Sequence, residues 1–339
     1  MDTHPRTFVT LSLALGATLA LVAAAGPAAA VPGVPGDADF LGAAQSLAVL
    51  GGQTVTSTGP TVITGDVAVA PGLAVTGFPP GLVSGGIYVP PAAQATAGQL
   101  DASAAYDALE ALGGTPVPTE LGGLEYGPGV YHGAPAASTL QLTGTVVLNG
   151  GPDDIFVFQS SSTLITASGS VVALMGGARA CNVFWQVGSS ATLGTSSLFA
   201  GTIIARTSVT ATTDAVVGSG ADEGARLLAL DGSVTLDSNV IGAPSACATA
   251  TGGLTAGAPG TPISAPTLAT ATALANASFA NAAAVRAANA PAVVAAAAPV
   301  LAETALDQRR PAAVALLVLL LGVVATTASA RRRAGARRG

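Results

Sequence analysis

The sequence predicts a mainly β protein, built as a β-solenoid with one long α-helix packed alongside. Of its 339 residues, 50% are apolar and only 9% are charged, while 43 are Gly and 4% are aromatic. High β-branched and Gly content with few charges favours closely spaced strands over solvated helices. Two further observations complete the prediction: a short Thr pattern that returns along the chain, and one stretch with helical spacing of its apolar residues.

Both ends of the chain are predicted to be targeting or anchoring segments. Residues 1–30 have the features of a secretory signal peptide, with Arg6 before an apolar stretch and small residues for cleavage. Residues 31–39 form a short linker. Residues 311–330 are about twenty apolar residues, long enough to cross a bilayer. The Arg-rich tail 331–339 should stay cytoplasmic, which places the body of the protein at the cell surface.

Between these ends, residues 40–248 are predicted to be one folded, monomeric unit. Residues 249–310 are rich in Ala, Thr and Pro and are expected to form a stalk, whose Ala-rich half could be partly helical. Inside the folded unit, a helix is expected over about 92–113, between Pro90-Pro91 and Gly113-Gly114. Its predicted apolar face consists of Ala93, Ala97, Leu100, Ala104, Ala108 and Leu112.

The repeated pattern is Thr, an apolar residue, any residue, then Thr or Ser. Repetition at a period of about 20–30 residues is typical of a solenoid, in which each rung buries its apolar side by stacking on the next. Because side chains alternate along a strand, the first Thr and the third position should face outward, and Thr192 and Thr210 should stand one above the other. The copies are Thr54–Ser57, Thr163–Thr166, Thr192–Thr195, Thr210–Thr213 and Thr235–Ser238.

Charge excludes one class of partner. Residues 31–300 hold four Arg and fifteen acidic residues, a net charge of −11. A nucleic-acid partner requires a basic face, so we expect none. No cofactor or metal site is predicted either.

Cys181 and Cys247 are the only cysteines. In an exported chain two cysteines usually pair, so we expect a structural disulfide between them. It would close a loop of 66 residues and stabilise the fold by roughly 4 kcal/mol on the chain-entropy model.

An enzyme is a rival interpretation, because many β-helices cleave polysaccharides. Such a site needs positioned carboxylates or a base. The acidic candidates occur in turn-like contexts, and the single His of the mature body lies beside a Tyr, so no catalytic set is predicted. The candidates are Asp66, His132, Asp153-Asp154 and Asp222-Glu223.

Several segments closely resemble the type I ice-binding proteins, the ice-binding-like family of antifreeze proteins. The run CNVFWQVGSSATLGTSSLFAGTIIA, residues 181–205, is similar to a hallmark segment of that family. Residues 41–81, 121–133, 153–174 and 230–242 continue the resemblance in the right order. The resemblance implies a discontinuous right-handed β-helix of triangular section, with a long α-helix alongside.

The resemblance also implies that one flat face binds ice. Some members carry Thr-(Ala or Gly)-x-(Thr or Asn) there; Thr210–Thr213 and Thr58–Thr61 fit, whereas Leu193 departs and Asp237 adds a charge. Ice is a neutral lattice, so a rigid face of Thr and Ser with little charge suits it. The expected ice-binding residues are Thr54, Thr56, Thr58, Thr61, Thr163, Thr192, Thr195, Thr210, Thr212, Thr213 and Thr235.

The sequence therefore predicts a non-catalytic, cell-surface protein whose partner is the ice crystal surface. The alternative is a surface adhesin or structural module that uses the same fold without strong ice affinity. Attachment could follow either of two routes: residues 301–305 (LAETA) with the apolar span resemble a cell-wall sorting signal, and simple membrane anchoring is the other.

Overall fold

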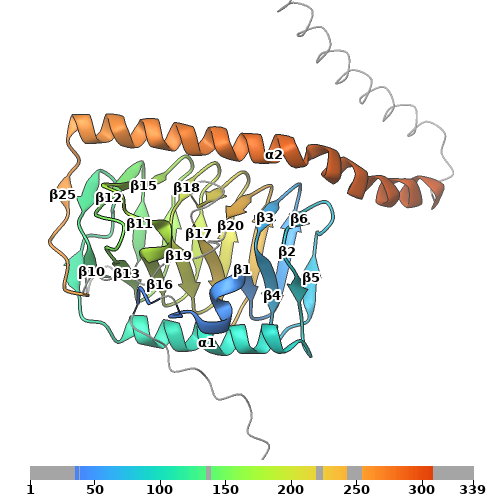
Figure 1. Ribbon diagram of the computed structural model, residues 1–339, viewed down its shortest axis with the longest axis horizontal. Coiled ribbons are helices and arrows are strands. Elements are labelled where there is room, and N and C mark those ends of the chain that lie inside the picture. The colour runs from blue at the N-terminus through green and yellow to red at the C-terminus, as the bar shows by residue number, and fades with distance from the viewer. Residues whose placement is uncertain (1–34, 38, 135–138, 219–223, 243–253, 308–339) are drawn as a thin grey trace, which may run out of the picture.

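The computed structural model describes residues 35–37, 39–134, 139–218, 224–242 and 254–307. Over these residues the chain winds as a solenoid whose three sides are sheets, which we call A, B and C, with one long helix on each of two sides (Figure 1). One coil consists of a strand in A, the next in B and the next in C, as in β1 (Leu47–Gly51), β2 (Thr54–Thr58) and β3 (Val62–Thr64). The mainly β solenoid predicted from the repeats is confirmed, whereas its right-handed winding stays a prediction.

Strands of different coils lie side by side in each sheet. In spatial order, sheet A is β7 (Ile87–Tyr88), β4 (Asp66–Val69), β1 (Leu47–Gly51), β22 (Arg226–Ala229), β19 (Thr202–Ala205), β16 (Val183–Val187), β13 (Phe156–Ser160), β10 (Gly129–Gly133) and β8 (Thr115–Val117). Sheet B is β11 (Leu140–Leu142), β14 (Leu164–Thr166), β17 (Ala191–Leu193), β20 (Val209–Ala211), β23 (Val234–Asp237), β2 (Thr54–Thr58) and β5 (Ala74–Thr76). Sheet C is β25 (Thr261–Pro262), β9 (Leu124–Tyr126), β12 (Thr145–Asn149), β15 (Val171–Met175), β18 (Leu198–Phe199), β21 (Val216–Val217), β24 (Val240–Gly242), β3 (Val62–Thr64) and β6 (Leu82–Val83).

The coils are not stacked in chain order, so the solenoid is discontinuous. The chain first forms the coils β1–β3 and β4–β6, and α1 (Ala93–Glu110) then runs along sheet A toward the other end. The later coils return from there, and β22, β23 and β24 pair in parallel with β1, β2 and β3. Residues from the two ends of the folded unit therefore become neighbours in all three sheets.

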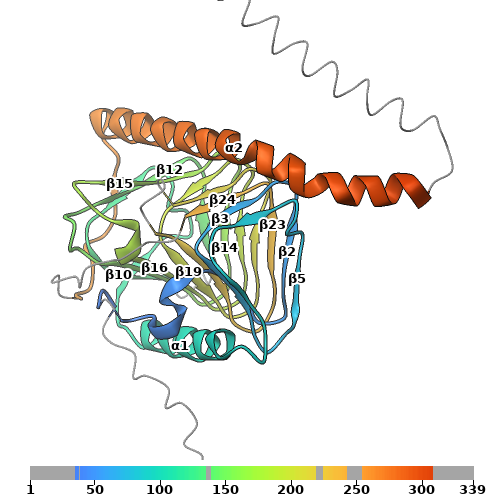
Figure 2. The same ribbon diagram turned by 45° about the vertical axis from the view of Figure 1, so that its right-hand side comes forward.

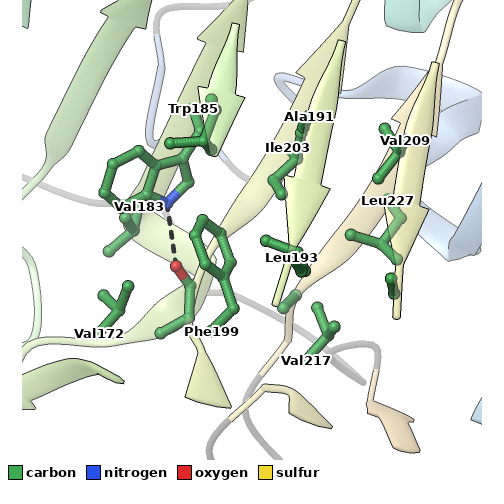
Figure 3. Packing of buried hydrophobic residues seen from close by; sticks show 14 of the residues in the cluster. Val172, Val183, Trp185, Ala191, Leu193, Phe199, Ile203, Val209, Val217 and Leu227 are labelled. Atoms are coloured by element: carbon green, nitrogen blue, oxygen red, sulfur yellow. Dashed lines mark hydrogen bonds between the residues drawn. The ribbon is translucent and has the colours of Figure 1, made fainter. Parts of the chain in front are cut away.

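The interior is filled by the inward side chains of all three sheets. Tyr131, Phe158 and Trp185 follow one another on β10, β13 and β16, and their rings stack with centroids 5.0 and 4.5 Å apart. The Trp185 indole donates a hydrogen bond to the Ala200 carbonyl at 3.0 Å, beside Phe199 (Figure 3). Such aromatic pairs add roughly 0.5–1.5 kcal/mol each beyond the burial of their area, so this stack stabilises the packing of neighbouring coils on one another.

The predicted helix is present as α1, but its buried face differs from the predicted one. Leu100 is 47% exposed, whereas Ala95, Gly98, Ala102, Ala105, Tyr106 and Leu109 are buried. The apolar spacing was ambiguous because alanine occurs on every side of this helix. Gly98 decides the contact face: a Cβ there would lie 2.6 Å from Leu47 Cδ1, so the helix approaches the sheet closely at this point.

The segment expected to be a stalk contains a second long helix, α2 (Ala265–Asp307). Its part up to Ala290 lies along sheet C, where Ala271, Ala275 and Ala282 are buried against Val171 and Leu198 among others (Figure 2). By length and composition, Ala265–Ala290 is the one helix of the described residues that could also cross a membrane. Its docking on the solenoid was not predicted from the sequence.

Several predicted features lie outside the described residues: the signal peptide 1–30, the apolar span 311–330, the tail 331–339 and Cys247. Cys181 lies in the short helix η2 (Ala180–Asn182). Because Cys247 lies outside the described residues, the pairing of the two cysteines stays a prediction. Residues 301–305, the expected sorting segment, fall within the last turns of α2.

Candidate functional site

Sheet B is the side of the solenoid on which neither described helix lies. Helix α1 contacts strands of sheet A, and α2 contacts strands of sheet C (Figure 2). The inward residues of the middle strands of sheet B, such as Ala191, Val209 and Val234, are fully buried. The outward residues are consequently presented to solvent on a supported, parallel sheet.

The outward residues at the middle of the strands form a row that we call the central file. Thr192 pairs with Thr210, and Thr210 with Thr235. The register then continues to the N-terminal coils, where Thr235 pairs with Thr56 and Thr56 with Thr76. Five threonines thus stand on five neighbouring strands, which are about 4.8 Å apart in a β-sheet. At the other end, the file continues with Ile165 and Gln141.

The hydroxyl groups of the central file are available to a ligand. Within the described part of the chain, none of these five threonines forms a side-chain hydrogen bond, while Thr76 and Thr235 are exposed and the other three are half-buried. A hydroxyl can donate one hydrogen bond and accept two. The file therefore offers a regular row of methyl groups and unpaired hydroxyls.

A second row, the leading file, lies two residues earlier on each strand, about 7 Å away in an extended chain. Its hydroxyls are partly paired with one another: Thr54 Oγ1 donates to Ser233 Oγ at 2.9 Å, and Thr163 Oγ1 donates to Thr139 Oγ1 at 3.0 Å. These bonds fix side-chain rotamers across neighbouring rungs. The leading file consists of Thr139, Thr163, Ser190, Ser208, Ser233, Thr54 and Ala74.

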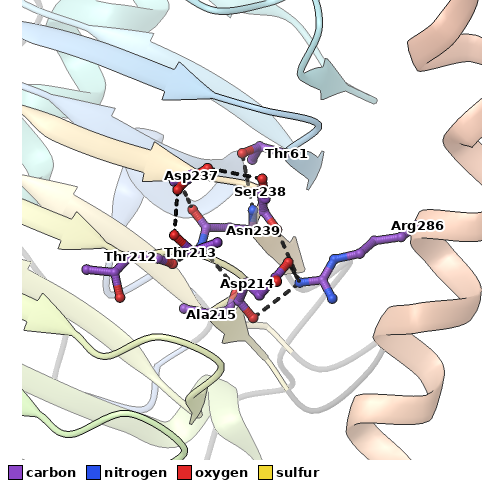
Figure 4. Close-up of polar contacts among 9 residues, drawn as sticks. All are labelled: Thr61, Thr212, Thr213, Asp214, Ala215, Asp237, Ser238, Asn239 and Arg286. Atoms are coloured by element: carbon purple, nitrogen blue, oxygen red, sulfur yellow. Dashed lines mark hydrogen bonds and ion pairs between the residues drawn. The ribbon is translucent and has the colours of Figure 1, made fainter. Parts of the chain in front are cut away.

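A third row, the trailing file, lies where sheet B turns toward sheet C. It consists of Ser168, Thr195, Thr213, Asp237 and Thr58. Asp237 is the only charged residue in the three files, and its carboxylate accepts hydrogen bonds from Thr213 Oγ1 at 2.6 Å and Ser238 Oγ at 3.0 Å (Figure 4). The carboxylate that interrupts the neutral face is thus bound to neighbouring hydroxyls.

Ten of the eleven expected residues are brought together on these rows or beside them. Thr56, Thr192, Thr210 and Thr235 lie in the central file; Thr54 and Thr163 lie in the leading file; Thr58, Thr195 and Thr213 lie in the trailing file. Thr212 is next to the trailing file, where its hydroxyl donates to the Leu193 carbonyl at 2.7 Å.

Thr61 was expected on the ice-binding face, but the structure buries it completely. Its hydroxyl accepts hydrogen bonds from Ser57 Oγ at 2.8 Å and from the Asn239 backbone N–H at 3.2 Å. Thr61 lies inside the corner between β2 and β3, so it braces the turn and does not reach the surface. The match of Thr58–Thr61 to the family pattern therefore does not describe an exposed unit.

The register of two copies also differs from the predicted alignment. The four-residue pattern aligned Thr54 and Thr163 with Thr192, but the structure places Thr56 and Ile165 opposite that position. The unit that repeats is a hydroxyl residue, a buried apolar residue and Thr: Ser190–Thr192, Ser208–Thr210, Ser233–Thr235 and Thr54–Thr56. This triplet is the signal that could have found Ser190, Ser208 and Ser233, which were not among the expected residues. Thr76 was also not among the expected residues; its triplet begins with Ala74 in place of a hydroxyl residue, so only its pairing with Thr56 identifies it.

The residues of the rival enzymatic interpretation do not converge. Asp66 Oδ1 accepts the Gly86 N–H and Asp154 Oδ2 accepts the Gly151 N–H, each at 2.8 Å, as turn-stabilising carboxylates do. His132 Nδ1 lies 3.1 Å from the Gly133 carbonyl. Asp222 and Glu223 lie outside the described residues. Among the residues that the structure does describe, no group of three His, Cys, Asp or Glu could hold a metal ion.

A comparison with models of protein families shows which family the chain resembles in sequence. The model of a family described as ice-binding-like matches residues 49–242, which is more than half of the chain. The chain belongs to the ice-binding-like family. The match is to the family as a whole and does not carry the narrower type I designation.

Curated ice-binding proteins are similar to this chain in sequence. An ice-binding protein of Nostoc sp. (strain HG1) is 46% identical over 210 residues, which are 60% of this chain and 73% of that protein. An ice-binding protein of Colwellia sp. is 38% identical over 125 residues, or 37% of this chain and 46% of that protein.

Solved structures of the family show the same fold. An ice-binding protein from an Antarctic biological consortium is 38% identical with a TM-score of 0.56, over 62% of this chain and 91% of that chain. One from the Antarctic ascomycete Antarctomyces psychrotrophicus is 39% identical with a TM-score of 0.55, over 60% of this chain and 96% of that chain. The family match ends at Gly242, so α2 lies outside it.

Proposed function

We propose that the chain is a cell-surface ice-binding protein and that sheet B is its ice-binding face. One observation carries the proposal: five threonines with unpaired hydroxyls stand in register on the one sheet that neither helix covers. The names of the curated relatives, which are ice-binding proteins, support the same conclusion.

The chemistry of the three files suits a neutral lattice. Ice presents no net charge, and the files contain a single charged side chain, Asp237. Threonine methyl groups favour ordered water next to the sheet, and the hydroxyls hold that water through bridging hydrogen bonds. Each contact is weak, but the sheet is already ordered before it meets the lattice, so little conformational entropy is lost on binding.

Attachment to the cell is the second part of the proposal. It rests on the predicted signal peptide 1–30 and on the apolar span 311–330 with its Arg-rich tail. An anchored ice-binding protein would hold the cell to ice or change ice growth close to its surface. A protein that diffuses freely would act throughout the surrounding liquid.

The direct test is nanolitre osmometry on the purified protein, together with ice recrystallisation. We expect thermal hysteresis, faceted ice crystals and slower recrystallisation at micromolar protein. The alternative, a surface adhesin or structural module without ice affinity, predicts crystals and recrystallisation identical to those in buffer. That result would contradict the proposed function, whatever the location of the protein.

A further inference from the structure

The corner at which sheet B turns into sheet C has an unusual backbone. In several rungs the turning residue is glycine with positive φ, as at Gly59 and Gly169. In three adjacent rungs it is instead Ser196, with φ 53°, Asp214, with φ 61°, and Ser238, with φ 56°. L-residues with side chains rarely adopt this left-handed region, although Asp tolerates it better than most. The turns at Asp214 and Ser238 directly follow Thr213 and Asp237 of the trailing file, so their conformation sets where that part of the file lies.

One brace holds the two turns from inside the solenoid. Asn239 is fully buried, and its side-chain amide donates to the carbonyls of Thr212 at 2.7 Å and Ala215 at 3.2 Å. Its Oδ1 accepts the Asp237 backbone N–H at 2.7 Å. Asn239 therefore ties the rung of β23 to the rung of β20 beneath it.

A second brace comes from outside, from α2. Arg286 Nη2 donates to the Asp214 carbonyl at 3.2 Å and to the Ser238 carbonyl at 3.1 Å, and it lies 3.4 Å from Asp214 Oδ1 (Figure 4). One guanidinium thus binds the left-handed residues of two neighbouring rungs. Both bonds come from the same nitrogen, whose two N–H groups are fixed in the guanidinium plane, so the rigid plane sets the position of the two carbonyls relative to each other.

Elsewhere the contact between α2 and sheet C is made largely by small side chains. Ala275 and Ala282 are buried there, and a groove of about 460 Å³ separates Leu274 and Ser278 from Met175 and its neighbours. Arg286 is the only charged residue between positions 265 and 302. It is therefore the one ionic attachment that this part of the helix makes to the solenoid.

We propose that Arg286 is a positioning residue for the ice-binding face. Through it, α2, which lies outside the family match, fixes the turns after β20 and β23 and so fixes the trailing file. The inference rests on the proposed function of sheet B. It assigns to the C-terminal helix a role in ice binding as well as in covering sheet C.

The test compares Arg286→Ala and Arg286→Lys with Arg179→Ala in the full chain. Arg179 is half-buried and forms no ion pair among the described residues, so its removal controls for the loss of one positive charge. Two readouts are needed: thermal hysteresis, and hydrogen exchange of the Asp214 and Ser238 amides, which bond to the carbonyls of Asp237 and Thr58.

We expect Arg286→Ala to accelerate exchange at these two amides and to lower hysteresis roughly 2- to 5-fold, the lower part of the range for residues coupled to a site without touching its ligand. Arg286→Lys should fall between Arg286→Ala and the native protein, and Arg179→Ala should match the native protein. Unchanged exchange at the two amides, or unchanged hysteresis in Arg286→Ala, would overturn the inference. So would faster exchange throughout the chain in both Arg286 variants, since that indicates only global destabilisation. If the native protein shows no hysteresis, the proposed function fails, and the exchange result still decides whether Arg286 holds the corner.

Discussion

Thr54 Oγ1 donates a hydrogen bond to Ser233 Oγ at 2.9 Å, although 179 residues separate them in the chain. The bond crosses the junction at which the last coil of the solenoid meets the first. Two residues further along each strand, Thr56 and Thr235 pair in the same register. The central file is therefore continuous only because α1 carries the chain back along sheet A, which lets separate parts of the sequence build one surface.

The run of threonines in the central file stops at Thr192, and the next position is occupied by Ile165. We expect Ile165→Thr to strengthen ice binding. Ile165 is 44% exposed and pairs with Thr192, so the change extends the file by one position with little loss of buried apolar area. Threonine, like isoleucine, is β-branched and suits a strand. Hysteresis should rise modestly while the melting temperature stays close to that of the native protein. A fall in hysteresis with the fold intact would indicate that the apolar side chain itself contacts ice.

The predicted disulfide leads to a stability measurement. If Cys181 and Cys247 pair, Cys181→Ser should lower the free energy of unfolding by roughly 4 kcal/mol, the value for closing a loop of this length. Denaturant unfolding of the exported protein measures this change, and peptide mass mapping without reduction identifies the bond. The prediction is wrong if both thiols of the unreduced native protein react with an alkylating reagent after unfolding.

Alkaline titration should reveal the aromatic interior. Burial raises the pKa of Tyr126 and of Tyr131 to about 12, against about 10 in an unfolded chain. The unfolded state thus loses these phenol protons first. Their contribution to stability is complete below pH 10 and is lost as the pH rises toward 12.

The absorbance of phenolate, followed in native and unfolded protein, measures the two pKa values directly. Arg226 acts in the opposite direction, because burial lowers its pKa to about 10 and its proton leaves the folded state first. Tyr126→Phe isolates the tyrosine contribution: stability should fall less steeply above pH 10 than in the native protein. Equal slopes would show that Tyr126 titrates normally in the fold.

Much of the fold could be predicted from the sequence because every rung of a solenoid has to meet the same packing requirement. Each rung needs a buried apolar residue flanked by outward ones, and that pattern predicted both the β-solenoid and the vertical pairing of Thr192 with Thr210. The register of the N-terminal coils could not be predicted, because no feature of the nearby sequence determines whether Thr54 or Thr56 pairs with Thr235. In the structure the partner is Thr56. That register depends on a contact made across the whole length of the chain.

The remaining differences have similar physical origins. Thr61 has the residue type of a surface position, but the corner after β2 turns its hydroxyl inward to Ser57 and Asn239. The docking of α2 on sheet C was missed because an Ala-rich helix shows no clear apolar stripe. Only its Arg286, placed opposite two backbone carbonyls, identifies the contact in retrospect.

The central claim is that the files of sheet B bind ice, and a pair of matched substitutions tests it most directly. Thr210→Tyr places a ring in the middle of the central file, whereas Thr96→Tyr places the same ring at an exposed position of α1, on the sheet A side of the solenoid. Both variants should keep the native melting temperature. Nanolitre osmometry should show that Thr210→Tyr lowers thermal hysteresis by about tenfold, because the ring prevents many weak contacts from acting together on a flat lattice. Thr96→Tyr should retain the native value, and the claim is contradicted if Thr210→Tyr retains it too or if Thr96→Tyr loses it.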